Sequence, residues 1–172
     1  GVRENGGQYT HGGVWLALAM AEMGHAADAW QLVSFLNPIA HSDTGEAVQR
    51  YCVEPYVLAA DVYTAEGHEG RGGWTWYTGS AGWLYQLLVG RLLGLRVRVD
   101  TLSIEPLFHP DWPSYTVHYR YRNTFYHIGV SQTAGGKTGK AGPVIVDDID
   151  QPDRLIHLVD DGREHHVTVE ID

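Results

Sequence analysis

Apolar residues in the first half of the chain recur at the three- and four-residue spacing of amphipathic helices. Stop signals for helices interrupt this pattern at Gly24, Asn37-Pro38 and Gly94. Asp43 or Thr44 is the expected cap of a short helix. The pattern predicts helices over residues 12–23, 26–36, 44–49, 54–62 and 80–93. The last of these is so apolar that we expect it to be buried in a larger helical assembly.

Beyond residue 95 the apolar period changes to two, which is typical of β-strands. In "SYTVHYRYRN", tyrosine and valine share one face, and polar residues that include His118 share the other. "TAGGKTGKAG" predicts a flexible loop and Asp161-Gly162 a hairpin turn. The predicted strands cover residues 96–99, 102–105, 115–122, 125–131, 143–146, 155–159 and 166–171. The order of helices before strands predicts an α+β fold of two subdomains that divide near residue 95.

The composition narrows the range of functions. The chain has 172 residues and a formal net charge of −9, from 21 acidic and 12 basic residues. Such an excess of negative charge argues against nucleic acid as a partner, because Lys and Arg must neutralise its phosphates. The negative net charge does not exclude a local site that binds one small anion. No apolar stretch reaches the roughly 20 residues of a membrane-spanning helix. The chain begins with Gly-Val instead of Met, and we interpret it as part of a longer protein.

The stretch "RGGWTWYTGSAGW", residues 71–83, combines glycines with aromatic side chains just before the last predicted helix. The first amides of a helix have no intrahelical partner and carry the positive end of its dipole. The hydroxyl of Thr78 and the backbone of Gly79 can therefore hold an anion there. Flat rings suited to stacking on a sugar are Trp74, Trp76, Tyr77 and Trp83. The alternative is a capped helix with aromatic residues in its core.

A second glycine-rich loop, "RENGGQYTHGG", also precedes an apolar helix. Its side chains Glu4, Asn5 and Gln8 are of the kind that hydrogen-bond sugar hydroxyls. His11 can bind an anion when protonated, or donate through one ring nitrogen. The alternative is a surface loop with Thr10 as a helix cap. Two such loops that each lead into an apolar helix favour a shared site.

Weaker signals have plainer interpretations. Ten histidines are present, but without an HExxH motif or paired Cys/His spacing we expect no metal site. Cys52 has no visible catalytic partner, and we expect a buried structural thiol. Glu54 before Pro55 is either a helix-start carboxylate or a contact for a sugar hydroxyl. Arg120 and Arg122 are expected to be solvated.

Three motifs, "ENGGQYTHGGVW", "YCVEPYVLAADVY" and "GRGGWTWYTGSAGW", together resemble the carboxyl-terminal part of glycoside hydrolase family 94. This family contains the cellobiose and chitobiose phosphorylases. Within it, the motifs are most similar to those of cyclic β-1,2-glucan synthases and β-1,2-oligoglucan phosphorylases. The segment "IEPLFHPDWPSYTVHYRYRNTFYHIGV" matches the terminal β-domain of the family, so the resemblance covers essentially the whole chain.

The resemblance implies the last helices of an (α/α)6 barrel over residues 1–95, followed by a small antiparallel β-sandwich of jelly-roll type over residues 96–172. It also implies phosphorolysis of a β-glucosidic bond with inversion, with inorganic phosphate as co-substrate and no cofactor. The residues that it implies for phosphate binding are His11, Thr78 and Gly79. It further implies that Glu4 contacts the sugar and that Gly12 lies at the acceptor side. The complete set of candidate substrate-binding residues is Glu4, Gln8, Gly12, Glu54, Trp76 and Tyr77.

The family's catalytic aspartate and a phosphate-binding arginine lie upstream of these motifs, and neither is on this chain. We therefore expect the chain alone to be inactive and to need the remainder of the barrel as its partner. Exposed barrel helices are expected to drive self-association. In the synthases this region lies on the cytoplasmic side of the bacterial inner membrane, which is the expected location. A non-catalytic carbohydrate-binding or structural module is the alternative.

Overall fold

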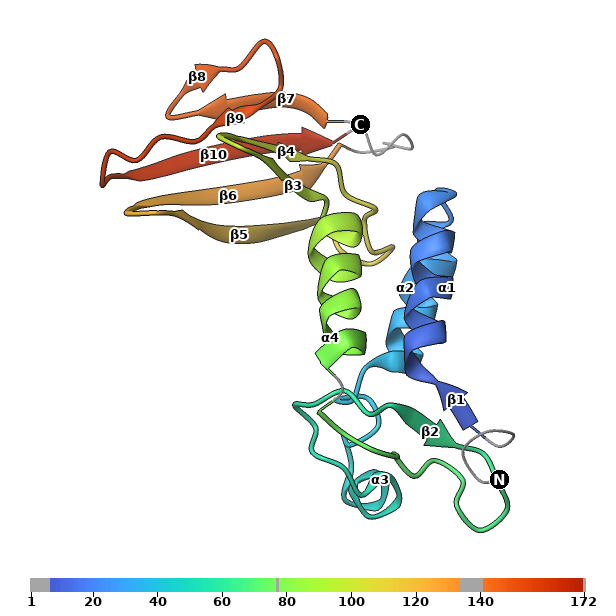
Figure 1. The fold of residues 1–172 in the computed structure, drawn as a ribbon. Helices are drawn as coiled ribbons and strands as arrows, with labels where there is room; N and C mark the ends of the chain where they lie inside the picture. The colour runs from blue at the N-terminus through green and yellow to red at the C-terminus, as the bar shows by residue number, and fades with distance from the viewer. Residues whose placement is uncertain (1–6, 77, 134–140, 172) are drawn as a thin grey trace. The chain divides into compact units, whose positions relative to one another are not determined.

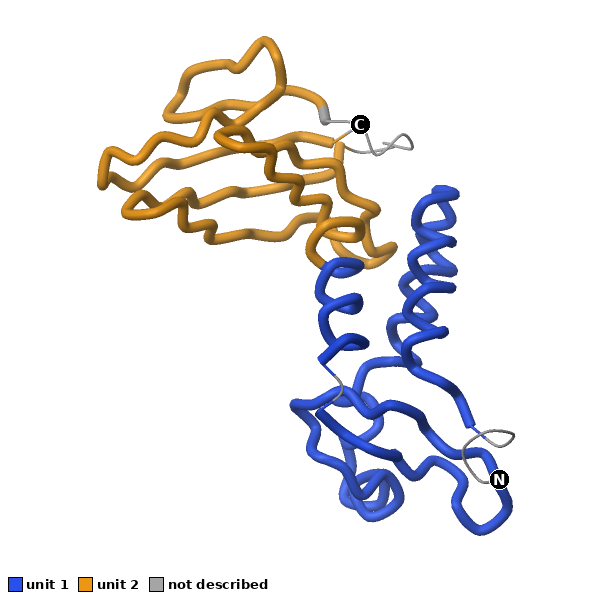
Figure 2. Tube along the Cα trace, viewed as in Figure 1, with its two compact units in different colours: residues 1–88 blue, residues 89–172 orange. Residues whose placement is uncertain are grey.

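The computed structural model describes residues 7–76, 78–133 and 141–171. The chain divides into two compact units, residues 1–88 and residues 89–172 (Figure 2). The first unit contains the elements β1 (Gly7–Tyr9), α1 (Thr10–Glu22), α2 (Ala26–Leu36), α3 (Gly45–Tyr51), β2 (Asp61–Tyr63) and α4 (Thr78–Tyr85) (Figure 1). The π-helix η1 (Gln86–Leu92) spans the boundary between the units. Among the described residues, no helix is long and apolar enough to cross a membrane.

Helix α1 contacts both α2 and α4. Its buried residues follow the helical spacing, and they are Thr10, Val14, Ala17 and Ala21. Gly13 lies so close to α2 that a Cβ on it would come within 2.9 Å of the Leu36 side chain. The small residues of α1 therefore allow a close approach of the two helices.

The ends of the first three helices agree with the sequence signals. Gly24 follows α1 with φ +79°, and Asn37 caps the end of α2. At the start of α3, the Thr44 hydroxyl accepts a hydrogen bond from the amide of Ala47 at 3.1 Å. Thr44 is thus the cap that was predicted as one of two candidates.

The helix predicted over residues 54–62 is wrong. Residues 57–61 are buried in succession, which a helix on a surface does not allow, and the segment continues into strand β2. The amide of Ala60 donates to the carbonyl oxygen of Trp74, and its own carbonyl oxygen accepts from Thr10. These groups find partners in distant segments instead of in a helical turn, and a short apolar run does not distinguish the two outcomes.

The helix predicted over residues 80–93 is present over 78–92, but it changes type along its length. It is α-helical in α4 and π-helical in η1. Gly94 ends it with φ +73°, and its carbonyl oxygen accepts from the Glu105 amide at 2.9 Å. The wider π turn is not visible in the sequence, because apolar spacings of four and five residues look alike in a nearly apolar segment.

The second unit is built from two sheets. Its strands are β3 (Leu95–Arg98), β4 (Thr101–Ile104), β5 (Ser114–Tyr121), β6 (Thr124–Gln132), β7 (Ala141–Val146), β8 (Ile149–Asp150), β9 (Ile156–His157) and β10 (Glu164–Ile171). The sheet orders are β3-β4-β9 and β5-β6-β10-β7-β8. The expectation of purely antiparallel pairing is wrong at one place, because β10 runs parallel to β6. The long connection through β7, β8 and β9 makes this possible, whereas a hairpin would force antiparallel pairing.

One apolar core is shared by the two sheets. It contains Leu102, Ile104, Tyr126, Ile128, Val130, Val144, Ile156, Leu158, Val167, Val169 and Ile171. The tyrosine and valine face of β5 packs against this core as the alternation predicted, and burial raises the pKa of its Tyr115. The opposite faces of β5, β6 and β10 carry the polar side chains. The predicted flexible loop lies mostly outside the described residues.

Candidate functional site

The three motifs of the first unit meet at Ala60. Its carbonyl oxygen accepts from the amide of Thr10, at the start of α1, and its amide donates to the carbonyl oxygen of Trp74, in the glycine-rich stretch 71–83. Strand β2 pairs with β1 along one edge, and an isolated bridge joins Val62 to Gly72 on the other. The segment 54–62, which was predicted as a helix, therefore connects both loops through backbone hydrogen bonds.

Glycines make this close arrangement possible. A Cβ on Gly73 would overlap the Asp61 carboxylate and come within 3.0 Å of the Tyr63 hydroxyl. Gly79 differs, since a Cβ there would meet nothing within 4 Å. The first glycine is required by packing, whereas the second leaves open space beside the start of α4.

His11 lies in the first turn of α1, beside the junction. Its ring meets the Trp15 ring edge to face, with centroids 4.9 Å apart and planes at 80°. Its Nε2 atom is buried and has no hydrogen-bond partner among the described residues. A buried ring nitrogen without a partner is unfavourable, so an acceptor or donor supplied by a ligand would stabilise it. Thr10 does not cap the helix, because the cap position belongs to Tyr9, which makes no side-chain bond there.

Helix α4 begins at Thr78, two residues earlier than predicted, so Thr78 and Gly79 form its first turn. Both residues are exposed. Helices α1 and α4 begin at the same end of the first unit (Figure 1), and Trp15 of α1 lies 5.7 Å from Trp83 of α4 between ring centroids. Both helix N-termini thus lie at one end of the unit, where the amides of a first helical turn favour an anion, although the Thr10 amide already donates to Ala60.

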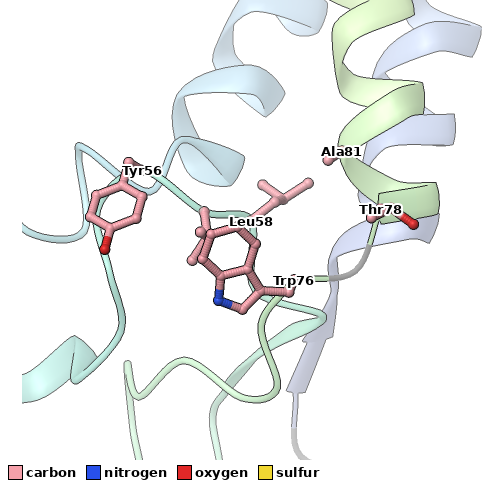
Figure 3. Close-up of a pocket in the computed structure, with 6 residues that line it drawn as sticks. Tyr56, Leu58, Trp76, Thr78 and Ala81 are labelled. Carbon is pink, nitrogen blue, oxygen red and sulfur yellow. The ribbon is translucent and has the colours of Figure 1, made fainter.

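A cavity of about 160 Å³ opens beside α4. Its lining residues are Tyr56, Val57, Leu58, Trp76, Thr78 and Ala81 (Figure 3). The rings of Tyr56 and Trp76 meet edge to face at a tilt of 67°, with centroids 6.5 Å apart. The Thr78 hydroxyl points away from these two rings (Figure 3). The cavity therefore presents flat aromatic surface on one side and the start of a helix on the other, which suits a sugar ring next to an anion.

The aromatic residues named from the sequence separate into different environments. Trp76 lines the cavity, whereas Trp83 packs against Trp15 between the helices. Trp74 is exposed, and its carbonyl oxygen belongs to the Ala60 junction. Tyr56 was missed as a site residue. Its signal was available, because it is the aromatic side chain that follows Pro55 in the second motif.

The remaining candidates lie around the junction. Gln8 pairs with Val62 in the β1–β2 ladder, and Gly12 lies one residue after His11 in α1. Glu54 is not at a helix start, because no helix forms there, and it does not line the cavity. Burial raises the pKa of Tyr51, and the negative charge of Glu54 adds to this effect. Glu4 and Tyr77 lie outside the described residues.

Two further expectations concern the thiol and metals. Cys52 is exposed, not buried, because its left-handed backbone (φ +55°) at the end of α3 turns it outward. Its Sγ donates to the carbonyl oxygen of Gln49 at 2.9 Å. Among the described residues, no group of three or more His, Cys, Asp or Glu side chains could hold a metal ion.

Comparison with known families agrees with these motifs. The family model described as "Glycosyl hydrolase 94 superfamily, catalytic domain" matches residues 1–94, which contain the Ala60 junction and the cavity. The chain belongs to this family.

Similar members of glycosyl hydrolase family 94 include a synthase and several phosphorylases. The chain is 48% identical over 145 residues to the cyclic beta-(1,2)-glucan synthase NdvB of Rhizobium meliloti (strain 1021), covering 84% of the chain and 5% of the synthase. It is 30% identical over 140 residues to the N,N'-diacetylchitobiose phosphorylase of Vibrio furnissii, covering 81% of the chain and 17% of that enzyme. It is 29% identical over 175 residues to the 3-O-beta-D-glucopyranosyl-beta-D-glucuronide phosphorylase of Paenibacillus borealis, covering 100% and 22%. The chain thus spans less than a quarter of each relative.

Proposed function

We propose that the chain is the carboxyl-terminal segment of an inverting β-glucan phosphorylase-like module that acts on β-1,2-glucosidic bonds, as part of a cyclic β-1,2-glucan synthase. The observation that carries the proposal is the Ala60 junction, which joins the loops of His11 and Trp76. Membership of family 94 and the phosphorylases among the relatives support the same reaction. An oxygen of inorganic phosphate attacks the anomeric carbon from the side opposite the leaving oxygen, in the place that water takes in an inverting hydrolase. The product is an α-glucosyl phosphate.

In this proposal the starts of α1 and α4 bind the phosphate. The Thr78 hydroxyl and the backbone amides of Thr78 and Gly79 donate to phosphate oxygens, and the helix dipole favours the negative charge. The buried Nε2 atom of His11 supplies a further hydrogen bond, for which it has no other partner among the described residues. The open space beside Gly79 allows the ligand to approach the backbone closely.

The sugar lies against the aromatic rings of Trp76 and Tyr56, with Glu4, Gln8, Gly12, Glu54 and Tyr77 as further proposed contacts. None of the six described residues that line the cavity carries a carboxyl group. A general acid must protonate the leaving oxygen, so we place it outside these residues, in the remainder of the barrel. The chain alone is then inactive. An aromatic cavity without a carboxylate equally favours the alternative of a non-catalytic carbohydrate-binding module.

The finer architecture belongs to the same proposal. Residues 1–95 would supply the last helices of an (α/α)6 barrel, and residues 96–172 would form a jelly-roll β-sandwich. The location on the cytoplasmic side of a bacterial inner membrane stays a prediction.

Calorimetric titration with inorganic phosphate tests the site directly. His11→Ala and Thr78→Ala each remove a donor to a charged ligand and should weaken binding about tenfold or more. Gly79→Ala tests the site more specifically, because its effects on binding and on stability should have opposite signs. Its Cβ fits without overlap and points toward the helix N-terminus, where the anion would lie. We expect it to weaken phosphate binding while it stabilises the helix by about 0.5–1 kcal/mol.

Ser34→Ala, on an exposed part of α2, is the matched control and should leave phosphate affinity unchanged. Equal phosphate binding by wild type and Gly79→Ala would contradict the proposed cradle. A separate assay for glucose 1-phosphate, with a β-1,2-linked glucose oligosaccharide and phosphate, distinguishes the two functions. Product formation by this chain alone would show that the acid is present here.

A further inference from the structure

Three histidines stand side by side on the polar face of the five-stranded sheet. The strand register places His118 of β5 opposite His127 of β6, and His127 opposite His166 of β10. The face is the one away from the core, because Tyr126 and Ile128, the neighbours of His127, are core residues. The histidines are nine and thirty-nine residues apart in sequence, so only the strand pairing brings them together.

His118 and His127 point ring nitrogens at each other. Their Nδ1 atoms are 2.6 Å apart, and the two rings are nearly perpendicular, at 72°. On the other side of His127, its Nε2 atom lies 3.3 Å from the carboxylate of Glu164. A carboxylate only accepts hydrogen bonds, so Nε2 carries the proton of neutral His127, and the lone pair of its Nδ1 accepts from the Nδ1–H of His118. A carboxylate that orients a histidine in this way is typical of metal-binding imidazoles.

We propose that Nδ1 of His118 and Nδ1 of His127 together bind one divalent late transition metal ion, such as Ni²⁺ or Zn²⁺. Metal–imidazole bonds of about 2.0–2.1 Å place two ligands at a right angle about 2.9 Å apart, and two tetrahedral ligands about 3.3 Å apart. The two Nδ1 atoms are 2.6 Å apart in the structure. They therefore have to separate less to bind octahedral Ni²⁺ than to bind a tetrahedral ion. His118 moves its proton to its outer nitrogen when the metal binds. Water fills the remaining positions, since no third ligand of the described residues completes the group.

The neighbouring positive charges are engaged elsewhere. The Arg120 guanidinium lies over the Phe125 ring at 5.5 Å, and its Nε donates to the carbonyl oxygen of Arg122. Arg122 itself lies over Tyr121, toward Asp160. Both side chains are thus held at the hairpin end of β5 by contacts that do not involve the two imidazoles.

A metal ion at this place would tie an edge strand to the sheet. Among the strands that the structure describes, β5 pairs with β6 alone in its sheet. Backbone hydrogen bonds of an edge strand open more easily than those of a central strand. A ligand that binds only the paired strands adds its binding free energy to the stability of that pairing.

The test is a titration of the 172-residue chain, without a polyhistidine tag, with NiCl₂ and ZnCl₂. We expect saturable binding of one ion, with a rise in unfolding temperature and slower hydrogen exchange of the β5 amides. His118→Gln and His127→Gln should each weaken binding at least about tenfold, and Glu164→Gln by about tenfold, through the orientation of His127. His68→Gln, a remote exposed histidine, is the control and should change nothing.

Two results would overturn the proposal. One is the absence of binding to wild type at tenfold molar excess of either metal, together with unchanged imidazole NMR signals. The other is a His166→Gln variant that loses as much affinity as His118→Gln, because the ion would then be held by a different set of ligands. Imidazole signals of wild type, followed during the titration, identify the liganding nitrogens without any substitution.

Discussion

At the scale of single residues, Trp76 combines an unfavourable backbone with a place in the lining of the cavity. Its φ is +63°, a region that costs a bulky residue about 1–2 kcal/mol relative to glycine. The residue is 67% exposed and lines the cavity together with Thr78 at the start of α4. A strained residue that the rest of the fold holds in place is frequent at binding sites.

Replacing Trp76 separates strain from binding. Trp76→Gly and Trp76→Ala should both lose affinity for a β-1,2-linked glucose oligosaccharide, because both remove the stacking surface. Only the glycine relieves the left-handed backbone, so its unfolding free energy should exceed that of the alanine variant by about 1 kcal/mol. Calorimetry of both variants measures the difference. Retained sugar binding in both would remove Trp76 from the site.

Gly94 is a position in the second unit where both the backbone angle and the packing require glycine. It has φ +73°, and a Cβ on it would overlap the backbone at Glu105 and Pro106. Gly94→Ala should therefore lower the unfolding free energy by more than about 3 kcal/mol, since backbone cannot move aside as a side chain can. Gly24→Ala is the matched control. It has a similar φ of +79° but open space, so only the backbone strain of about 1 kcal/mol is expected. Equal losses in chemical denaturation would mean that overlap contributes nothing.

The sequence predicted one side of the cavity and missed the other for physical reasons. The helix start beside Thr78 and Gly79 was predictable, because an apolar run after a glycine-rich loop indicates a helix. Their binding of phosphate stays a prediction. Tyr56 was not identified, because its neighbours were assigned to a helix that does not form. The exposure of Cys52 depends on a left-handed φ, which no spacing of apolar residues encodes.

At the scale of elements, the strand alternation after residue 95 predicted most of the sheet, since each face needs a period of two. The partners of the strands were not predictable. The parallel pairing of β6 with β10 joins segments separated by three other strands. The His118–His127 pair escaped the search for metal motifs for the same reason, because its spacing is set by a hairpin register instead of a helix or loop.

His165 joins two turns of the second unit and predicts a pH dependence. Its Nδ1 lies 2.6 Å from Asp147, which follows β7, and its Nε2 lies 3.3 Å from Asp161, which precedes β10. The hydrogen bond to Asp147 raises the pKa of His165, against the opposing effect of partial burial, and Asp161 adds to the rise. The same contact lowers the pKa of Asp147.

The sign follows from the shift of the histidine. Its folded-state pKa lies above the ordinary value of 6.5, so the stabilisation is complete below that pH and disappears as pH rises through the folded value. His165→Gln should lower the unfolding free energy by about 1–2 kcal/mol at pH 6 and by less at pH 9. His157→Gln, which breaks a more exposed pair with Asp153, is the control and should change stability little. Urea unfolding from pH 5 to 9 checks this, and parallel curves for wild type and His165→Gln would contradict it.

At the scale of the whole molecule, the first unit leaves much apolar surface uncovered. Exposed apolar side chains on α1 and α2 include Trp15, Leu16 and Phe35, and others surround the cavity. Isolated soluble domains rarely expose so many large apolar side chains on neighbouring helices. The proposed barrel would cover such a surface.

The chain by itself should therefore self-associate. We expect concentration-dependent oligomers in analytical ultracentrifugation, with a reducing agent present because Cys52 is exposed. Leu16→Glu and Phe35→Glu should each weaken association about tenfold, since a charge would have to be buried. Gln31→Glu adds the same charge at a polar position of α2 and should have little effect. A monomer at all concentrations would contradict the expectation.

The position of β10 has a consequence for synthesis of the protein. This strand lies between β6 and β7, at the centre of its sheet, although it is the last strand of the described chain. A ribosome adds about 5–20 residues per second from the amino end, so β5 to β9 leave the exit tunnel before the strand that connects them. During that interval β6 and β7 expose unpaired edges, which invite pairing with other nascent chains. A premature stop before residue 164 would remove the middle of the sheet and not its margin. The truncated chain would then expose unpaired edges on both β6 and β7, and cellular quality control would recognise it as unfolded instead of as a slightly shortened domain.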